Sequence, residues 1–329
     1  MSSDSRNTRD SLVPRVSAII INWNSAPLLK RCLESLRADP DVGDWQVIVV
    51  DNASDEDPSP MIRETLPAAE IARPETNLGF SGGNNLGARQ AGGEYLLFLN
   101  ADTEVVPGAI RGLATFLDEH PDAGAVGPRL VGADGSVQVS AGVFPGPWQY
   151  LSSSLHLARV SVPDSVGPVD YVAGAALMIR RGAFDAVGGW SEAYFFYGED
   201  AELCARLRDT ETPLTYYVPD VTIAHLEGGS VASVPNWKAL AANQGALLYV
   251  SRNRSTRALL AMRAAVLIGN AGRAALWLAM WPFAAAKGRG RQAWERSRTC
   301  GRIARLALAP VEAFSSKPPD KPTEDPAND

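Results

Sequence analysis

The feature that most constrains the fold is an alternation of continuous apolar runs with amphipathic segments along the first half of the chain. Val16–Ile21, Gln46–Val50 and Tyr95–Leu99 are short apolar runs, which are typical of strands buried on both faces. Pro27–Arg37 and Pro107–Glu119 repeat their apolar residues at helical spacing. This order predicts an α/β fold with a mostly parallel sheet and helices on both faces.

The remaining elements are expected from the same kinds of pattern. Gly142–Gly167 is rich in Gly, Pro and Ser and is interpreted as a loop or lid. We expect a short helix near Pro60–Leu66, a strand around Glu70–Ala72, a helix near Asn85–Ala91, a strand at Gly124–Pro128, a strand with an internal glycine at Asp170–Ile179, a helix at Gly198–Leu207, short strands at Thr215–Val218 and Val221–Ala224, and a helix at Trp237–Arg254.

Polar side chains follow three of the predicted strands, at the point where each strand ends. Asn22 and Asn24 follow the first strand, Asp51 the second, and Asn100 and Asp102 a later one. In open α/β sheets the crevice outside the carboxyl ends of the strands is the ligand site. We therefore expect these residues to meet at one cleft, although Asp51 could instead cap the helix near residue 60.

Between these strand ends lies a segment rich in glycine and asparagine, Asn77–Gly87, which we expect to form a loop before a helix. Such a loop could bring backbone N–H groups and a helix N-terminus to the phosphates or ribose of a nucleotide. It matches neither GxGxxG nor the GK[ST] of a P-loop, so dinucleotide-binding and P-loop interpretations fail. A plain surface turn remains the alternative.

Three further side chains are candidates for chemistry. Asp102 offers an oxygen ligand of the kind that Mg²⁺ and Mn²⁺ prefer. Glu199 and Asp200 stand together at a predicted helix start, where they could supply a general base or simply place favourable charge at the helix N-terminus. His225 follows a predicted strand, and it could be a ligand or a structural histidine.

Taken in order, these segments resemble the inverting glycosyltransferase family 2, which has the GT-A fold. The resemblance is closest to its bacterial rhamnosyltransferase-like branch of cell-wall and surface polysaccharide assembly. The matching segments are IIINWNS (Ile19–Ser25), VVDNASD (Val49–Asp55), NLGFSGGNNLG (Asn77–Gly87), FLNADTEV (Phe98–Val105), AGAALMIRRGAFDAVGGWSEAYFFYGEDAELCARL (Ala173–Leu207) and AHLEGGS (Ala224–Ser230).

The resemblance implies a role for each candidate residue. Asp200 is similar to the catalytic base of the family, with Glu199 beside it. Asp102 would contact a divalent metal, Mg²⁺ or Mn²⁺, on the donor diphosphate, and His225 would close that site. The nucleotide-sugar pocket would be lined by Asn22, Asn24, Asp51, Asn77, Gly79, Asn84, Asn100 and Gly174.

One position departs from the DxD element of the family, because Asn100 stands where its first Asp is expected. One negative charge fewer should weaken metal binding and make Asp102 and the donor diphosphate more important. The QxxRW element of processive members is absent, which favours addition of a single sugar. The expected reaction uses a nucleotide-diphosphate sugar, plausibly dTDP-L-rhamnose, and a hydroxyl of a glycan or polyprenyl-linked glycan.

Charge is distributed unevenly along the chain. The whole sequence has 31 Lys and Arg against 37 Asp and Glu, which argues against a nucleic-acid binder. In contrast, residues 252–305 hold twelve basic residues and one acid, Glu295. The apolar Arg257–Ala286 segment, with its tryptophans and nearby cations, predicts a helix at an anionic membrane surface. Packing against the catalytic domain, or a homo-oligomer, is the alternative.

These patterns predict four regions: a disordered N-terminus (1–14), a GT-A domain (15–254), a basic amphipathic helical region (255–312) and a disordered tail (313–329). The three scattered cysteines and the polar N-terminus favour a cytoplasmic protein, peripheral at the inner face of the membrane. Two other functions stay open, a sugar nucleotidyltransferase and a catalytically silent sugar- or membrane-binding scaffold. The NWNSAPLL sequence after the first strand disfavours the nucleotidyltransferase, which would carry a basic glycine-rich loop there.

Overall fold

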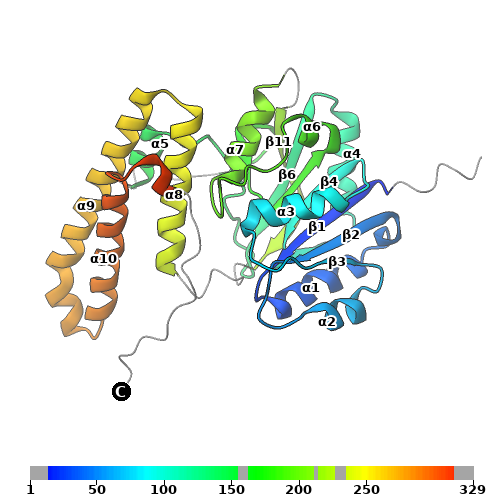
Figure 1. Ribbon diagram of the computed structural model, residues 1–329, viewed down its shortest axis with the longest axis horizontal. Helices are drawn as coiled ribbons and strands as arrows, with labels where there is room; N and C mark the ends of the chain where they lie inside the picture. Colours follow the sequence, from blue (N-terminus) through cyan, green and yellow to red (C-terminus); the bar gives the residue numbers. More distant parts are fainter. Residues whose placement is uncertain (1–13, 155–161, 211–213, 227–234, 315–329) are drawn as a thin grey trace, which may run out of the picture.

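The computed structural model describes residues 14–154, 162–210, 214–226 and 235–314, and it places a curled nine-stranded sheet beside a group of C-terminal helices (Figure 1). The predicted disordered segments, 1–14 and 313–329, lie almost entirely outside these residues. The sheet order is β3-β2-β1-β4-β10-β6-β11-β5, with β8 paired to β11.

The first half of the sheet is parallel. It consists of β1 (Val16–Asn22), β2 (Trp45–Asp51), β3 (Glu70–Ala72) and β4 (Tyr95–Asn100). In register, Asn22 lies opposite Asp51 and Ile21 lies opposite Asn100. The polar residues after β1, β2 and β4 therefore emerge at the same edge of the sheet, as the sequence predicted.

The second half mixes strand directions. Here β10 (Ala176–Arg180) runs antiparallel between β4 and β6 (Ala123–Val131), and β11 (Leu214–His225) runs parallel to β6. On the far side of β11 lies β5 (Thr103–Val105), antiparallel to it, with Thr103 opposite His225. This pairing joins two segments that are far apart in sequence. Off this path, β8 (Gly167–Val169) pairs with β11, and β7 (Ala141–Gly142) with β9 (Tyr171–Val172) forms a small second sheet.

Both faces of the large sheet are covered by helices because side chains alternate along its strands. Ala18 and Ile20 point into one apolar cluster, and Ile19 points into the other. The first cluster is closed by α1 (Ala26–Arg37), α2 (Ser59–Thr65) and α4 (Ala109–Glu119), with the 3-10 turn η1 (Val42–Asp44) beside them. The second is closed by α3 (Gly79–Gln90), α6 (Arg181–Ala186) and α7 (Glu199–Arg208). The predicted α/β class is confirmed.

The expected loop at Asn77–Gly87 is wrong for most of its length, since α3 already begins at Gly79. The glycines of α3 allow this helix to pack closely against β1. A Cβ on Gly87 would lie 2.5 Å from Cγ2 of Ile19, and one on Gly83 would lie 2.9 Å from Cδ1 of Ile21. Without side chains at these positions the helix can approach β1 closely.

Three other boundaries also differ from the prediction. The expected strand at Asp170–Ile179 is split between β9 and β10, which belong to different sheets, and Gly174 lies in the break. The two short strands expected at residues 215–224 form one strand, β11, with a register shift in it. The region expected as loop or lid contains a helix, α5 (Pro147–Ser154).

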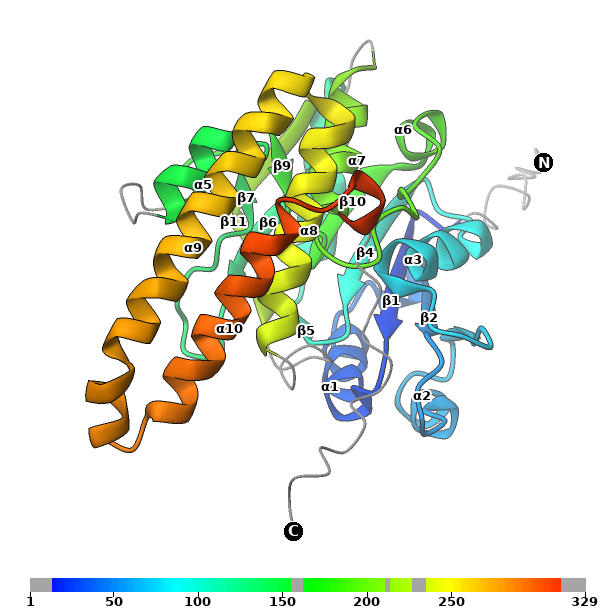
Figure 2. The same ribbon diagram turned by 60° about the vertical axis from the view of Figure 1, so that its left-hand side comes forward.

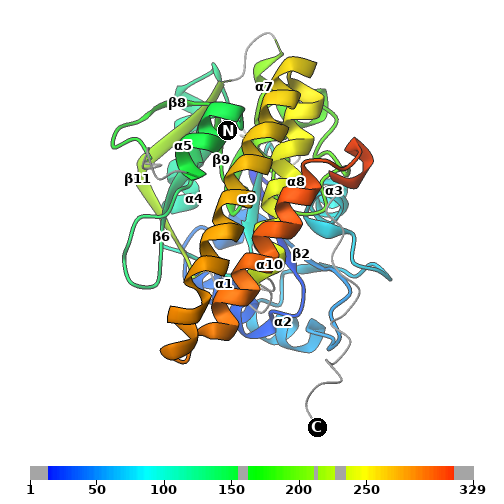
Figure 3. The same ribbon diagram turned by 90° about the vertical axis from the view of Figure 1, so that its left-hand side faces the viewer.

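After β11 the chain forms α8 (Pro235–Asn253), α9 (Thr256–Ala286), α10 (Gly290–Leu306) and the 3-10 turn η2 (Val311–Phe314). Helix α10 runs back along α9, while the first half of α9 packs against α5 and α8 (Figures 2 and 3). Asn270 Nδ2 donates to the Tyr150 hydroxyl at 2.6 Å, which ties α9 to α5. Among the described residues, α9 is the one helix long and apolar enough to cross a membrane by length and composition.

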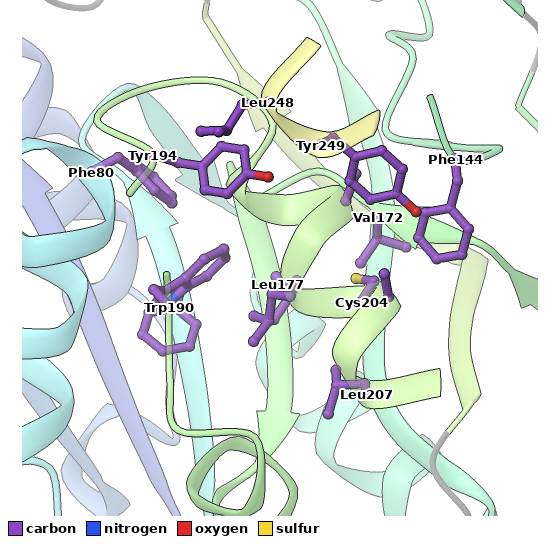
Figure 4. Packing of buried hydrophobic residues seen from close by; sticks show 14 of the residues in the cluster. Phe80, Phe144, Val172, Leu177, Trp190, Tyr194, Cys204, Leu207, Leu248 and Tyr249 are labelled. Atoms are coloured by element: carbon purple, nitrogen blue, oxygen red, sulfur yellow. The ribbon is translucent and has the colours of Figure 1, made fainter. Parts of the chain in front are cut away.

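Helix α8 joins the C-terminal helices to the sheet domain. The Tyr249 ring on α8 stacks with Phe144 at 5.6 Å between centroids, next to Val172 and Cys204 (Figure 4). Leu248 belongs to the same buried cluster as Phe80 and Trp190 (Figure 4). The C-terminal helices therefore share a continuous apolar core with α3 and α7.

Candidate active site

The ends of β1 and β2 are tied together by a buried polar network. Asn22 Nδ2 donates to Asp51 Oδ1 at 2.8 Å and to Ser54 Oγ at 3.1 Å. Arg73, directly after β3, donates from Nε to Asp51 Oδ2 at 2.9 Å. The Asp51 side chain is fully buried, so this guanidinium supplies the countercharge that a buried carboxylate requires.

Asn24 closes the turn after β1. Its backbone takes a left-handed conformation with φ of 51°, which Asn tolerates better than most residues. Its N–H donates to Ser54 Oγ at 2.8 Å, and its Oδ1 accepts the N–H of Asp55 at 2.8 Å. The turns after β1 and β2 thus hold each other in place.

Asn52 fastens the start of α3 to the same edge. Its Oδ1 accepts the N–H of Leu78 at 2.9 Å, while its Nδ2 donates to Asn77 Oδ1 at 2.8 Å and to the Gly79 carbonyl at 2.9 Å. Gly79 has φ of 74°, and a Cβ there would lie 2.7 Å from Phe195. Asn77 and Gly79 are thereby placed near Asp51. Further along α3, Asn84 is buried and both of its amide atoms lack a hydrogen-bond partner among the described residues.

Asn100, Asp102 and His225 meet at the carboxyl end of β4. His225 Nε2 lies 3.3 Å from Asp102 Oδ1 and 3.5 Å from Asn100 Nδ2. The backbone closes the same contact, because the Leu226 N–H donates to the Asp102 carbonyl at 2.9 Å. A carboxylate oxygen and an imidazole nitrogen therefore face one point, and both side chains are largely buried.

The orientation of the His225 ring is set by Gln138, in the segment after β6. Gln138 Nε2 donates to the His225 carbonyl at 2.9 Å, which leaves Gln138 Oε1 at 2.8 Å from His225 Nδ1. The Gln138 oxygen accepts a hydrogen bond from Nδ1–H, and Nε2 of the same ring faces Asp102.

Glu199 and Asp200 begin α7, after a turn in which Tyr197 and Gly198 have φ of 70° and 96°. Burial, with a further contribution from Asp200, raises the pKa of Glu199 to about 8. Burial also raises the pKa of Asp200, while hydrogen bonds from the backbone of Ala201 and Gly174 oppose that rise. Glu199 Oε2 has no hydrogen-bond partner within the described part of the chain, so this carboxyl is suited to the neutral form.

The break between β9 and β10 connects the two acidic groups. Gly174 hydrogen-bonds Asp200 through its backbone, and the carbonyl of the next residue, Ala175, accepts the N–H of Asn100 at 3.0 Å. A Cβ on Gly174 would lie 3.0 Å from Phe80, so the backbone passes close to α3 at this point. Asp200 is thus linked through two consecutive residues to the Asn100–Asp102–His225 group.

Arg73 and Gln138, like Asn52 and Ser54, belong to this network but were not among the predicted site residues. Arg73 stands at the carboxyl end of β3, where the rule applied to the other strands would have found it. Gln138 has no such signal, because its segment shows only a short alternation and its contact with His225 spans 87 positions. Among the described residues, no group of three or more His, Cys, Asp or Glu side chains could hold a metal ion.

Comparisons with known proteins agree with this architecture. A family model described as glycosyl transferase family 2 matches residues 17–187. The chain is 26% identical over 260 residues to N-acetylglucosaminyl-diphospho-decaprenol L-rhamnosyltransferase of Mycobacterium tuberculosis, covering 72% of this chain and 84% of that protein. It is 28% identical over 206 residues to the low-salt glycan biosynthesis hexosyltransferase Agl10 of Haloferax volcanii, covering 61% of this chain and 64% of that protein.

Two solved structures have a similar fold. The mannosyltransferase PcManGT of Pyrobaculum calidifontis, solved with GDP-Man and Mn²⁺, superposes with a TM-score of 0.54 at 18% identity, covering 92% of this chain and 85% of that one. GalNAc-T7, solved with UDP, GalNAc and Mn²⁺, also gives 0.54 at 16% identity, covering 74% and 48%. The GT-A architecture expected from the sequence is confirmed by these likenesses.

Proposed function

Because this chain belongs to glycosyl transferase family 2, we propose that it transfers a single sugar from a nucleotide-diphosphate sugar to a hydroxyl of a polyprenyl-linked glycan. The acceptor is suggested by the mycobacterial relative, which is named as a rhamnosyltransferase acting on N-acetylglucosaminyl-diphospho-decaprenol. The same name suggests L-rhamnose as the sugar, with dTDP-L-rhamnose as donor. Transfer takes place at the cytoplasmic face of the membrane, within cell-envelope polysaccharide assembly.

The observation that carries this proposal is the gathering of Asp102, His225 and Asn100 at one strand end, with Asp200 connected to them through Gly174 and Ala175. Side chains at the ends of β4 and β11 meet there, and the start of α7 is linked to them through the backbone of Gly174 and Ala175. This is the carboxyl edge at which α/β folds bind their ligands. A scaffold without activity gives no reason for a buried Asp102 and a half-buried Asp200 at this edge of the sheet.

The donor nucleotide lies along the edge formed by β1 and β2. Asn22, Asn24 and Asp51 hold the base side of the pocket. Gly79 and Asn84 line it from α3, and Asn77 lines it from the turn before α3. Arg73 joins this set, since its guanidinium already pairs with Asp51. Asn100 and Gly174 border the sugar and diphosphate.

Mg²⁺ or Mn²⁺ fits the residues present. Asp102 Oδ1 and His225 Nε2 face each other at 3.3 Å, and these two side chains would hold the cation. Divalent cations in such sites commonly take one or two protein ligands and complete their shell with phosphates and water. Bound there, the cation would supply positive charge to the departing diphosphate. With Asn100 in place of an acid, the donor diphosphate contributes more of the binding.

Asp200 acts as the general base of an inverting displacement. The acceptor hydroxyl attacks the anomeric carbon from the side opposite the leaving diphosphate, and Asp200 takes its proton. Glu199 stays neutral beside it, since its pKa of about 8 lies above neutral pH. Two adjacent carboxyls thereby hold one negative charge, placed on Asp200.

A panel of donors tests the proposal. Thermal shifts of the full chain are measured with dTDP-L-rhamnose, GDP-mannose and UDP-N-acetylglucosamine, with and without Mn²⁺, because a ligand that binds the native state stabilises it. We expect one donor to raise the melting temperature in a metal-dependent way and to be consumed with a polyprenyl-diphosphate glycan. Asp102→Ala should lose the metal-dependent part of that shift. Absence of any donor-dependent shift would reject the assignment.

A further inference from the structure

The half of the α9–α10 hairpin that is farthest from α5 leaves large apolar side chains uncovered. Phe283 is 74% exposed, and Trp281 and Trp294 are 46% and 49% exposed. We call the following exposed set the hairpin patch: Leu276, Leu278, Met280, Trp281, Phe283 and Trp294. Three of its members, Leu278, Trp281 and Trp294, line one hollow together with Gly290 and Arg291. Large apolar side chains left exposed at one end of a helical hairpin indicate an interaction site.

Positive charge borders the patch. Lys287, Arg289 and Arg291 occupy the turn between the helices and the first residues of α10, and all are exposed. Arg296 lies over the Trp277 ring at 4.8 Å. The one acid in this region, Glu295, is already paired with Arg291 at 3.0 Å. The hairpin patch therefore has basic side chains beside its apolar ones.

The positive charge beside the hairpin patch indicates what kind of partner binds there. A second copy of this chain docked through the same patch would bring two identical groups of basic side chains together, and their repulsion opposes association. An anionic lipid leaflet offers apolar chains beneath a layer of phosphates, which matches both parts of the patch.

The packing of α9 argues against a membrane-spanning arrangement. Along the hairpin, α10 covers one side of α9: Ala293 and Ser297 are buried, and Ser297 Oγ donates to the Ala274 carbonyl at 3.1 Å. If α9 crossed the bilayer, the arginines of α10 and the charged turn would enter the hydrocarbon core. Placing a charged side chain there has a high free-energy cost. The hairpin can satisfy both its apolar and its basic groups by lying in the interface.

We propose that the hairpin patch binds the surface of an anionic membrane, with Trp281 and Phe283 at the boundary between headgroups and acyl chains and Arg289 and Arg291 against lipid phosphates. In Figures 1 and 2 the carboxyl end of β1 and the turn between α9 and α10 point toward the same, lower side of the molecule. A membrane bound by the patch therefore lies on the side of the molecule toward which β1 runs. Membrane binding through the hairpin patch does not depend on which sugar is transferred.

Vesicle flotation of the full chain tests this surface. Vesicles of phosphatidylcholine alone are compared with vesicles in which one third of the lipid is phosphatidylglycerol. Wild-type protein is expected to float with the anionic vesicles and to be released by high salt. Trp281→Ser with Phe283→Ser should lower the partition coefficient by about tenfold or more, because it removes the apolar contact. Arg289→Gln with Arg291→Gln should remove about tenfold or more of the preference for phosphatidylglycerol.

Leu260→Ser with Ile268→Ser is the matched control, since these residues are 62% and 68% exposed on the first half of the same helix. It should float like wild type. Circular dichroism melts establish that each variant is folded, and light scattering of each gives the oligomeric state. Unchanged flotation of the folded Trp281/Phe283 variant overturns the proposal. So does a wild-type dimer that this variant abolishes while vesicle binding persists, because the patch would then face a second copy.

Discussion

Gln138 holds His225 through two hydrogen bonds, one to the ring nitrogen Nδ1 and one to the backbone carbonyl. The pair fixes both the position of the histidine and the direction of Nε2, which faces Asp102 at 3.3 Å. Partners of this kind orient a histidine ligand and raise its basicity, and their loss commonly weakens metal binding by about 10- to 100-fold.

We therefore expect Gln138→Leu to raise the Mn²⁺ concentration needed for half-maximal donor binding by about 10- to 100-fold, while saturating metal restores most of the activity. Leucine is similar in size but cannot make either hydrogen bond. Calorimetric titration of Mn²⁺ in the presence of the donor measures the change. Gln149→Leu, at an exposed position on α5, is the control and should behave like wild type. An unaltered metal affinity in Gln138→Leu would show that metal binding does not depend on the hydrogen bonds between Gln138 and His225.

The two neighbouring carboxyls of α7 should differ sharply in mutational sensitivity. Asp200→Asn removes the proposed base and should lower kcat by about 10²- to 10⁴-fold with donor affinity retained. Glu199→Gln replaces a group that is already neutral near pH 7, because burial raises its pKa to about 8, and should change kcat only a few-fold. Steady-state kinetics and donor binding are measured for both. The base assignment fails if Glu199→Gln is the more damaging change.

Burial of Glu199 also predicts a pH dependence of stability. The unfolded chain ionises this carboxyl near its ordinary pKa of 4.5, whereas the folded protein keeps it neutral up to about pH 8. Its contribution to stability is thus fully present below pH 4.5 and is lost as the pH rises toward 8, with a slope of at most about 1.4 kcal/mol per pH unit.

Glu199→Gln abolishes this titration. The melting temperature of the variant should therefore rise relative to that of wild type as the pH increases from 5 to 8. Melting curves of both proteins across this range give the difference directly. Glu94→Gln, at an exposed position, should run parallel to wild type. A constant offset between Glu199→Gln and wild type at all pH values would mean that Glu199 is ionised in the folded protein.

The parts of the site that could be predicted from the sequence are those set by local pattern. Asn22, Asp51 and Asn100 follow apolar runs, and strands in parallel register bring such positions to one edge. That rule needs only the strand ends and their direction. It would have found Arg73 as well, had it been applied to the short strand β3.

The rest depends on contacts between distant segments. His225 reaches Asp102 because β5 pairs with β11 in a register that places Thr103 opposite His225, which no periodicity predicts. The glycines of α3 suggested a loop because glycine is a poor helix former. Their real role is close packing against Ile19 and Ile21, which becomes visible only when β1 is placed beneath the helix.

Gly245 is the position where α8 lies closest to the turn before α7. A Cβ there would lie 2.0 Å from the carbonyl oxygen of Tyr197 and 3.2 Å from the nitrogen of Gly198. These two residues already have positive φ and lead directly into Glu199 and Asp200. Gly245→Ala must therefore displace either α8 or the turn, at a cost of about 1–3 kcal/mol. Because the turn leads to Asp200, kcat should fall while donor binding changes little.

Urea unfolding measures the loss of stability in Gly245→Ala, and steady-state kinetics measure the fall in kcat. Gly272→Ala, in the interior of α9 with no neighbouring atom within 4 Å, is the matched control, and it should stabilise the protein by up to about 1 kcal/mol. If the two alanine variants prove equally stable and active, α8 does not constrain the turn.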